Sequence, residues 1–171
     1  MLRTGSLAIT VATTALWIAH ASSSSRPVAR EPPACNGFDF PVGAPDGIGY
    51  YDAQAFGEND HLGNDWNGNG GGDSDLGDPV YAVADGVVID ANDHGEGWGN
   101  VVRVVHPCAG ELESLYAHLD TMNVAVGTLV SRGDRIGTIG NARGRYRAHL
   151  HFELRERSLP LGARASVSPS E

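Results

Sequence analysis

Short apolar runs separated by turn-forming residues dominate the chain from about residue 79 to residue 140. Segments such as "VYAVA", "VVIDA", "VVRVVH" and "ESLYAHL" have the length and the β-branched content of strands. No long stretch shows an apolar period of 3.6 residues, so ordinary helices are not predicted. Glycine is frequent (23 of 171 residues), whereas aromatic residues make up only 7%. We therefore predict a mainly β fold, a compact antiparallel sheet or barrel-sandwich hybrid.

The first 21 residues have the pattern of a secretory signal peptide. A basic residue, Arg3, precedes an apolar stretch, and small residues follow in Ala19-His20-Ala21. The alternative is a membrane anchor, but the apolar stretch 7–20 is short of the roughly 20 residues that span a bilayer. We expect cleavage after Ala21, and hence an exported protein, periplasmic or extracellular, without stable membrane insertion.

The rest of the chain divides by composition. Residues 22–36 are rich in serine and proline and are predicted to be a flexible linker. Residues 37–157 are predicted to form the folded domain, and residues 158–171 an unstructured tail. Within the domain, residues 67–78 are expected to be a solvated Gly/Asp-rich loop, with calcium binding as the alternative. The Asp85-Gly86 pair indicates a hairpin or a bulge.

The chain has two cysteines, Cys35 and Cys108. In an oxidising compartment an isolated pair is most simply a disulfide. Two free thiols or metal ligands are the alternatives, although 73 residues between them without a CxxC motif argue against a zinc-thiolate site. The pattern leaves the pairing open.

The charge balance argues against nucleic acid as a partner. The chain carries 12 Lys and Arg against 21 Asp and Glu, a formal net charge of −9. Nucleic-acid-binding proteins usually present a basic surface. The sequence gives no indication of the oligomeric state.

Two histidines stand one residue apart in "RAHLHFELRE", residues 147–156, which has the pattern of a buried strand. Side chains alternate between the faces of a strand, so His149 and His151 point to one side and the apolar residues to the other. One strand can supply two groups to a metal site but cannot complete that site. Further ligands must come from another segment.

The segment "HLGND" offers such ligands in His61 and Asp65. Gly63 and Asn64 between them favour a loop, which can fold both side chains onto one ion. Zinc accepts histidine nitrogen and aspartate oxygen, and three protein ligands leave a fourth position open for catalysis. We therefore predict a zinc site built from His61, Asp65 and one histidine of the pair.

A hydrolase also needs groups that move protons. "YAHLD" offers His118, whose predicted strand places it on the same face as Ser114 and Tyr116. His106, at the end of another strand, has no companion that suits a metal and is predicted to be structural.

These motifs occur in a recognisable order. "HLGND", "GDPVYAVADGVV", "GWGNVVRVVH", "SLYAHL", "VGTLVSRGDRIGTIG" and "HLHFEL" follow one another, from about Phe56 to Arg155. In this order the chain resembles the lysostaphin-like zinc metallopeptidases, the LytM-type peptidoglycan endopeptidases of bacteria. The resemblance implies their compact antiparallel β fold and one zinc ion bound by His61, Asp65 and His151. It also implies that His118 and His149 are the catalytic histidines.

The resemblance implies a function as well. A member of this family would be a zinc metalloendopeptidase that hydrolyses peptide bonds in the stems or cross-bridges of peptidoglycan. One alternative is a non-catalytic relative that activates another wall hydrolase, although such relatives typically lack several of the five residues that this sequence keeps. A second alternative is a structural zinc or wall-binding module without turnover.

Overall fold

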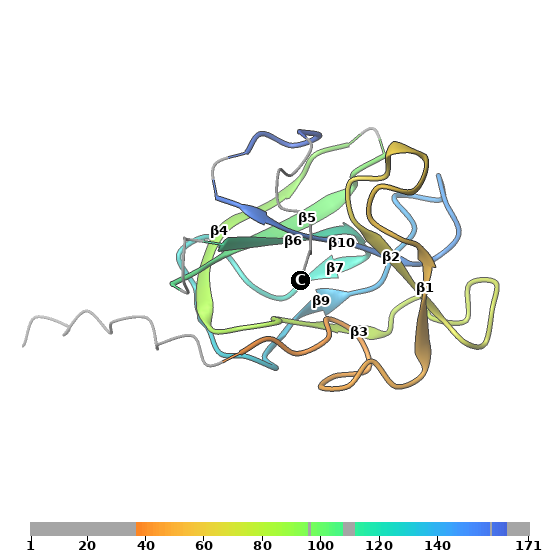
Figure 1. Cartoon of the computed structure of the whole chain (residues 1–171), viewed down its shortest axis with the longest axis horizontal. Coiled ribbons are helices and arrows are strands. Elements are labelled where there is room, and N and C mark those ends of the chain that lie inside the picture. The colour runs from red at the N-terminus through yellow and green to blue at the C-terminus, as the bar shows by residue number, and fades with distance from the viewer. Residues whose placement is uncertain (1–36, 96, 108–111, 158, 164–171) are drawn as a thin grey trace, which may run out of the picture. The chain divides into compact units, whose positions relative to one another are not determined.

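The computed structural model describes residues 37–95, 97–107, 112–157 and 159–163. The predicted signal peptide, the predicted linker and both cysteines lie outside these residues. Within them the chain forms ten strands, one 3-10 turn (η1) and no α-helix (Figure 1). The elements in chain order are β1 (Tyr50–Gln54), η1 (Glu58–Asp60), β2 (Asn64–Gly68), β3 (Pro79–Tyr81), β4 (Gly86–Asp93), β5 (Asn100–His106), β6 (Leu112–Leu119), β7 (Thr121–Met122), β8 (Leu129–Val130), β9 (Arg135–Thr138) and β10 (Leu150–Glu156).

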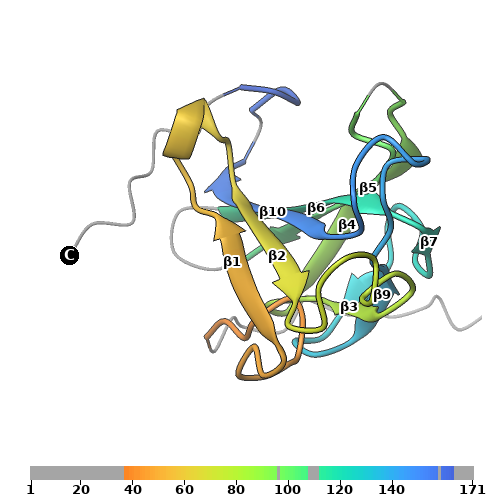
Figure 2. The same ribbon diagram turned by 90° about the vertical axis from the view of Figure 1, so that its right-hand side faces the viewer.

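Two antiparallel sheets make up this fold. Seven strands follow the order β1-β2-β10-β6-β5-β4-β8, and three follow the order β3-β9-β7. The mainly β, antiparallel fold class predicted from the sequence is confirmed. Strand β10, late in the chain, pairs with β2 on one side and β6 on the other (Figure 2). This insertion brings residues near position 63 beside residues near position 150.

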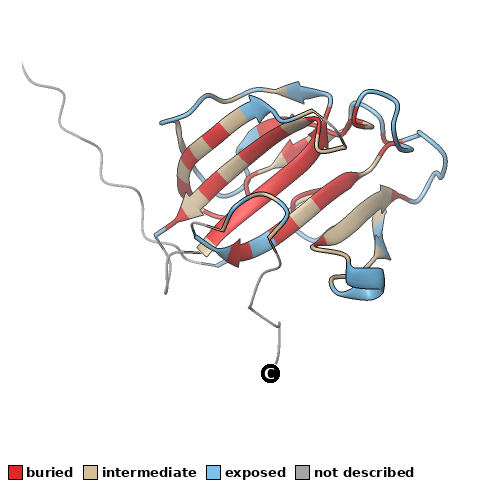
Figure 3. Cartoon of the chain, turned by 90° about the horizontal axis from the view of Figure 1, so that it is seen from above, coloured by how far each residue is buried: buried red, intermediate tan, exposed pale blue. Residues whose placement is uncertain are grey.

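The larger core contains side chains from both sheets. Its fully buried members include Val80 of β3, Ile136 of β9, Val102 of β5 and Leu150 of β10. Alternation along the strands places these residues on one face, as the apolar pattern predicts. Figure 3 shows burial concentrated on the central strands, whereas β1 and η1 are largely exposed. A smaller cluster of Val101, Leu115 and Ala117 covers the opposite face of β5 and β6.

His106 is structural, as predicted. Its Nδ1–H donates to the carbonyl of Asp85, which leaves Nε2 to accept the hydroxyl of Ser114 at 2.7 Å. Tyr116 then donates its hydroxyl to Ser114 at 2.9 Å and accepts the backbone N–H of Val83. Burial lowers the pKa of His106. The ring therefore remains neutral and completes a fully hydrogen-bonded chain inside the core.

The Asp85-Gly86 pair forms neither the predicted hairpin nor the alternative, a bulge; the irregularity of β4 lies between Val88 and Asp90 instead. Strand β3, before this pair, belongs to the small sheet, and β4, after it, pairs with β5 and β8 in the large one. A Cβ at Gly86 would lie 2.5 Å from the carbonyl oxygen of Val105. Gly86 thus permits a close passage of the chain between sheets, a requirement that resembles a turn signal in the sequence.

The Gly/Asp-rich loop is tied to the body of the fold. Asp75 accepts the N–H of Gly68 at 2.9 Å, and Asp73 accepts the N–H of Ala148 at 2.7 Å. Asp78 accepts the hydroxyl of Tyr50. These carboxylates bond to the chain itself, which explains the acidic residues without a calcium ion. The bond from Asp73 also fixes the backbone next to His149.

Residues 159–163 differ from the predicted unstructured tail. The guanidinium of Arg155 donates to the carbonyls of Leu159 and Pro160, and Arg103 donates to that of Leu159 at 3.2 Å. Leu161 packs against the smaller apolar cluster. The sequence pattern misses this segment because backbone carbonyls, not side-chain periodicity, hold most of it.

Candidate metal centre

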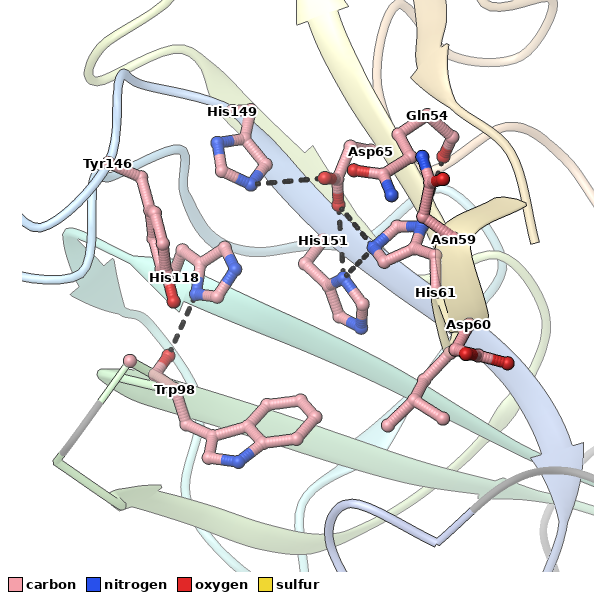
Figure 4. A pocket seen from close by; sticks show the side chains of 12 residues that line it. Gln54, Asn59, Asp60, His61, Asp65, Trp98, His118, Tyr146, His149 and His151 are labelled. Atoms are coloured by element: carbon pink, nitrogen blue, oxygen red, sulfur yellow. Dashed lines mark hydrogen bonds and ion pairs between the residues drawn. The ribbon is translucent and has the colours of Figure 1, made fainter. Parts of the chain in front are cut away.

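Three side chains with metal-binding atoms converge where β2 meets β10. Asp65 lies directly opposite His151 in the β2–β10 ladder, and His61 precedes β2 by three residues. The sequence predicted a loop for both His61 and Asp65. Asp65 instead belongs to β2, so the hydrogen bonds of the ladder fix its position. All three side chains point toward one another in Figure 4.

The three donor atoms form a nearly equilateral triangle. Nε2 of His61 lies 3.0 Å from Nδ1 of His151 and 3.1 Å from Oδ1 of Asp65, and the last two atoms are 3.0 Å apart. Each atom is thus close enough to the other two to share one ion. The sequence predicted His61, Asp65 and one histidine of the pair, and the family resemblance implied that this histidine is His151.

The hydrogen bonds on the far sides of the two rings define the tautomers. His61 donates Nδ1–H to the carbonyl of Gln54, and His151 donates Nε2–H to the carboxylate of Glu153, each at 3.1 Å. Because these oxygens can only accept, the two protons sit on those nitrogens. When both rings are neutral, the inward atoms are three lone-pair donors 3.0–3.1 Å apart. Such a set needs a proton or a metal ion between its atoms, and two imidazoles with one carboxylate suit zinc.

Gly63, between His61 and Asp65, is required by space and not by backbone conformation. A Cβ at Gly63 would lie 2.2 Å from the carbonyl oxygen of Phe152 and 2.9 Å from Cγ of Glu153. The missing side chain lets the start of β2 approach β10 closely. The glycine that suggested a loop in the sequence therefore serves strand pairing.

Gly63→Ala is expected to lower the free energy of unfolding by about 1–3 kcal/mol, because the new methyl group forces β2 away from β10. The same displacement should weaken zinc binding. Thermal unfolding and a zinc titration measure the two effects. Gly127→Ala, next to the edge strand β8, is the control for a loss of stability alone: its Cβ would meet no atom within 4 Å, but its φ of 87° disfavours alanine, so this variant should unfold more easily and still bind zinc like the wild type. Equal zinc affinity in Gly63→Ala and the wild type would contradict this explanation.

His118 reaches the same cavity through an irregularity in β6. Leu119 pairs with Asn100 and Tyr116 pairs with Val102, so two residues, Ala117 and His118, oppose Val101 alone. This is a β-bulge, and His118 has the left-handed backbone angle φ 62°. The bulge turns His118 to the face opposite Tyr116. The prediction that these two side chains share a face is therefore wrong, because strict alternation ignores the extra residue.

His118 and His149 are held in the same way, each by its Nδ1 atom. Nδ1–H of His118 donates to the carbonyl of Trp98 at 3.2 Å, and Nδ1–H of His149 donates to that of Arg147 at 2.8 Å. In the neutral form of each ring, Nε2 is therefore the nitrogen that carries the lone pair. Nε2 of His149 lies 3.6 Å from Oδ2 of Asp65, beside the donor triangle (Figure 4). Both rings can accept a proton.

The local charges separate the pKa values of these groups. Burial, together with the nearby His149 and His151, lowers the pKa of His118 to about 3. Burial also acts to lower the pKa of His151, but the carboxylates of Asp65 and Glu153 outweigh it and raise that pKa to about 9. Burial acts to raise the pKa of Asp65, yet the histidines bring it below its usual value. His118 is therefore neutral at pH 7, and a metal ion must displace a proton from His151.

The histidines line an open cavity of about 530 Å³. Its walls include Trp98, from the β4–β5 connection, and Tyr146, from the loop before β10. The ring centroids of Tyr146 and His118 are 5.0 Å apart. An ion pair joins Arg143, in the loop that carries Tyr146, to Asp93, the last residue of β4. Sequence reasoning missed Tyr146, although the resemblance included the "GWGN" motif that contains Trp98.

The fold and the site define a class of protein: an antiparallel β protein with a three-donor metal centre and two further histidines in one open cavity. Residues 60–163 match the Peptidase family M23, and the chain belongs to this family. The resemblance to lysostaphin-like peptidases is thereby confirmed for family and fold.

Similar proteins include both a hydrolase and an activator. Over 94 residues, 55% of the chain, it is 38% identical to the peptidoglycan DD-endopeptidase ShyA of Vibrio cholerae. Over 79 residues, 46% of the chain, it is 38% identical to the murein hydrolase activator NlpD of Escherichia coli. The matched parts are 21% of ShyA and 20% of NlpD, so the chain corresponds to a fraction of these relatives.

The fold is also similar to solved structures. The antimicrobial peptidase lysostaphin from Staphylococcus simulans aligns with a TM-score of 0.56 and 28% sequence identity. The alignment covers 66% of this chain and 45% of the lysostaphin chain. In the part of the chain that the structure describes, no helix is long and apolar enough to cross a membrane.

Proposed function

We propose that the protein is an exported zinc metalloendopeptidase that hydrolyses peptide bonds in the stems or cross-bridges of bacterial peptidoglycan. The observation that carries this proposal is the convergence of three possible metal ligands, His61, Asp65 and His151, beside two histidines whose Nδ1 atoms are held by backbone carbonyls. A structural zinc site does not need the two further histidines, His118 and His149. A site for hydrolysis needs both parts.

Zinc bound by His61, Asp65 and His151 would act as a Lewis acid toward a peptide carbonyl and make hydroxide available near neutral pH. Nε2 of His149 lies beside this centre and accepts a proton from the attacking water. As the C–N bond breaks, the proton on His149 passes to the leaving amine, and Nε2 of His118, neutral at pH 7, accepts the second proton of the water from the new carboxylic acid. Trp98 and Tyr146 border the cavity and orient the peptide.

The choice of substrate rests on the relatives. The name of ShyA places its activity on peptidoglycan, and the name of NlpD places its role on murein hydrolysis. Both names concern the bacterial cell wall. The wall lies outside the cytoplasm, and an exported protein, as the predicted signal peptide at residues 1–21 implies, would reach it.

Purified protein incubated with defined peptidoglycan tests the proposal. We expect mass spectrometry to detect fragments with new amino termini, lost on chelation and restored by zinc. Intact muropeptides after long incubation of the zinc-loaded protein would contradict it.

The similarity to NlpD supports a second candidate, a non-catalytic activator of another wall hydrolase. The five retained residues weigh against it. A metal-free protein that stimulates a separate amidase, with no cleavage of its own, would favour the activator.

A further inference from the structure

A network of buried charged side chains extends from the metal centre along one face of β10. Residues alternate along a strand, so His151, Glu153 and Arg155 share that face. Oε1 of Glu153 accepts Nε2–H of His151 at 3.1 Å, and Oε2 accepts a guanidinium N–H of Arg155 at 2.9 Å. Glu153 is 2% exposed and Arg155 is fully buried.

This charged network continues into the neighbouring strands. Arg155 lies 3.4 Å from Glu113 of β6, which is also fully buried. Glu113 in turn accepts two hydrogen bonds from Arg103 of β5, at 2.7 and 2.8 Å. The carbonyls of Leu159 and Pro160 accept the N–H groups of Nη2 of Arg155. Two carboxylates and two guanidinium groups thus balance in charge.

Stability alone is a weak reason for such an arrangement. Taking charges out of water costs several kcal/mol per ion, and apolar residues of similar volume usually stabilise a core as well or better. The same face of the sheet carries an apolar cluster of Val101, Leu115 and Ala117, so apolar packing was available there. The charged network contacts His151 through Glu153, which suggests a role at the metal centre.

Glu153 decides which nitrogen of His151 faces the donor triangle. A carboxylate can only accept, so Nε2 carries a proton and Nδ1 is the nitrogen whose lone pair a bound metal ion can take. A carboxylate behind a ligand histidine also makes the ring a stronger donor. Arg155 holds Glu153 in place, and the carbonyls of residues 159 and 160 hold Arg155.

We propose that Glu153 is a positioning residue for the metal: it sets the tautomer and orientation of His151, and Arg155 and the 159–160 segment support it. The proposal rests on the proposed function only in that the centre binds zinc. Turnover plays no part in it.

Glu153→Gln is the informative variant because it keeps the volume of the side chain. Its single oxygen can serve either His151 or Arg155, and its NH₂ group then faces the other. If the NH₂ group faces His151, the proton of that ring moves to Nδ1 and blocks the metal. If the oxygen faces His151, the NH₂ group opposes Arg155 and the negative charge is lost. Either outcome weakens zinc binding.

Glu113→Gln is the matched control. It places the same amide in the same charge network, but Glu113 bonds to Arg103 and Arg155 and not to a donor of the triangle. Competition with a chromophoric chelator gives the zinc affinity of each variant, and thermal unfolding of the metal-free proteins gives their stability. We expect Glu153→Gln to bind zinc about 10–100-fold more weakly than the wild type. The zinc affinity of Glu113→Gln should stay within about threefold of the wild type, because Glu113 contacts no metal donor and reaches the centre only through Arg155 and Glu153.

Equal zinc affinity in Glu153→Gln and the wild type would overturn the proposal, and so would an equal loss in Glu113→Gln. If Glu153→Gln fails to fold, nitrogen-15 NMR of the zinc-loaded wild type decides the question: zinc on Nδ1 of His151 with a protonated Nε2 supports the proposal, and zinc on Nε2 refutes it. A wild-type protein that binds no zinc refutes the proposed function instead. The two failures are therefore distinguishable.

Discussion

Asp65→Asn is expected to abolish zinc binding and peptide hydrolysis together. The substitution keeps the shape of the side chain but removes the only carboxylate in the donor triangle, and with it the negative charge that faces three histidines. The loss of zinc affinity should exceed about 100-fold, the upper end of the effect of an outer-shell partner, because Asp65 itself is a donor. Chelator competition and release of soluble wall fragments measure the two losses.

Asp60→Asn is the matched control for this variant. Asp60 lines the same cavity but is not a member of the triangle. Its backbone has φ 63°, a conformation that asparagine also tolerates, so the substitution adds no strain. Asp60→Asn should therefore keep zinc. Full zinc binding and full hydrolysis in Asp65→Asn would refute both the assigned centre and the proposed chemistry.

The strands were predictable because their signals are local. Short β-branched runs, apolar alternation and turn residues identify β4, β5, β6 and β10 without any knowledge of pairing. The division into two sheets was not predictable, because it depends on where chain segments separated by many residues meet. The Asp85-Gly86 pair illustrates the difference: the sequence shows that the chain turns there, whereas only the structure shows that it leaves one sheet for the other.

The donor triangle could be anticipated from residue types and order, but its surroundings could not. Nothing in "YAHLD" indicates that Ala117 and His118 together oppose one residue of β5, and that bulge decides which face His118 occupies. In contrast, the alternation of His151, Glu153 and Arg155 was visible in the sequence. Three polar side chains on one face of a buried strand were a signal of a buried network, and attention to the histidine pair alone missed it.

Loss of turnover without loss of zinc is the result expected for His149→Gln and for His118→Asn. Neither side chain belongs to the donor triangle, so zinc affinity should remain within about threefold of the wild type. Each Nε2 atom is assigned a proton transfer, and the removal of one such group typically costs about 10²–10⁴-fold in rate. Asparagine suits position 118 because it tolerates the left-handed backbone there. Zinc content and the initial rate on a defined peptide separate the two effects.

His94→Gln is the control that separates proton transfer from a general loss of histidine. His94 is exposed and pairs with Asp90 at 2.8 Å, outside the cavity. The hydrolysis rate of His94→Gln should therefore match that of the wild type. If His149→Gln or His118→Asn loses zinc as well as rate, that histidine acts on the metal centre and not on the proton. If both variants keep zinc and full rate, the site binds metal without using the second pair, and the structural-module alternative gains support. The separation of zinc binding from turnover is therefore the property that distinguishes a peptidase from its non-catalytic alternatives.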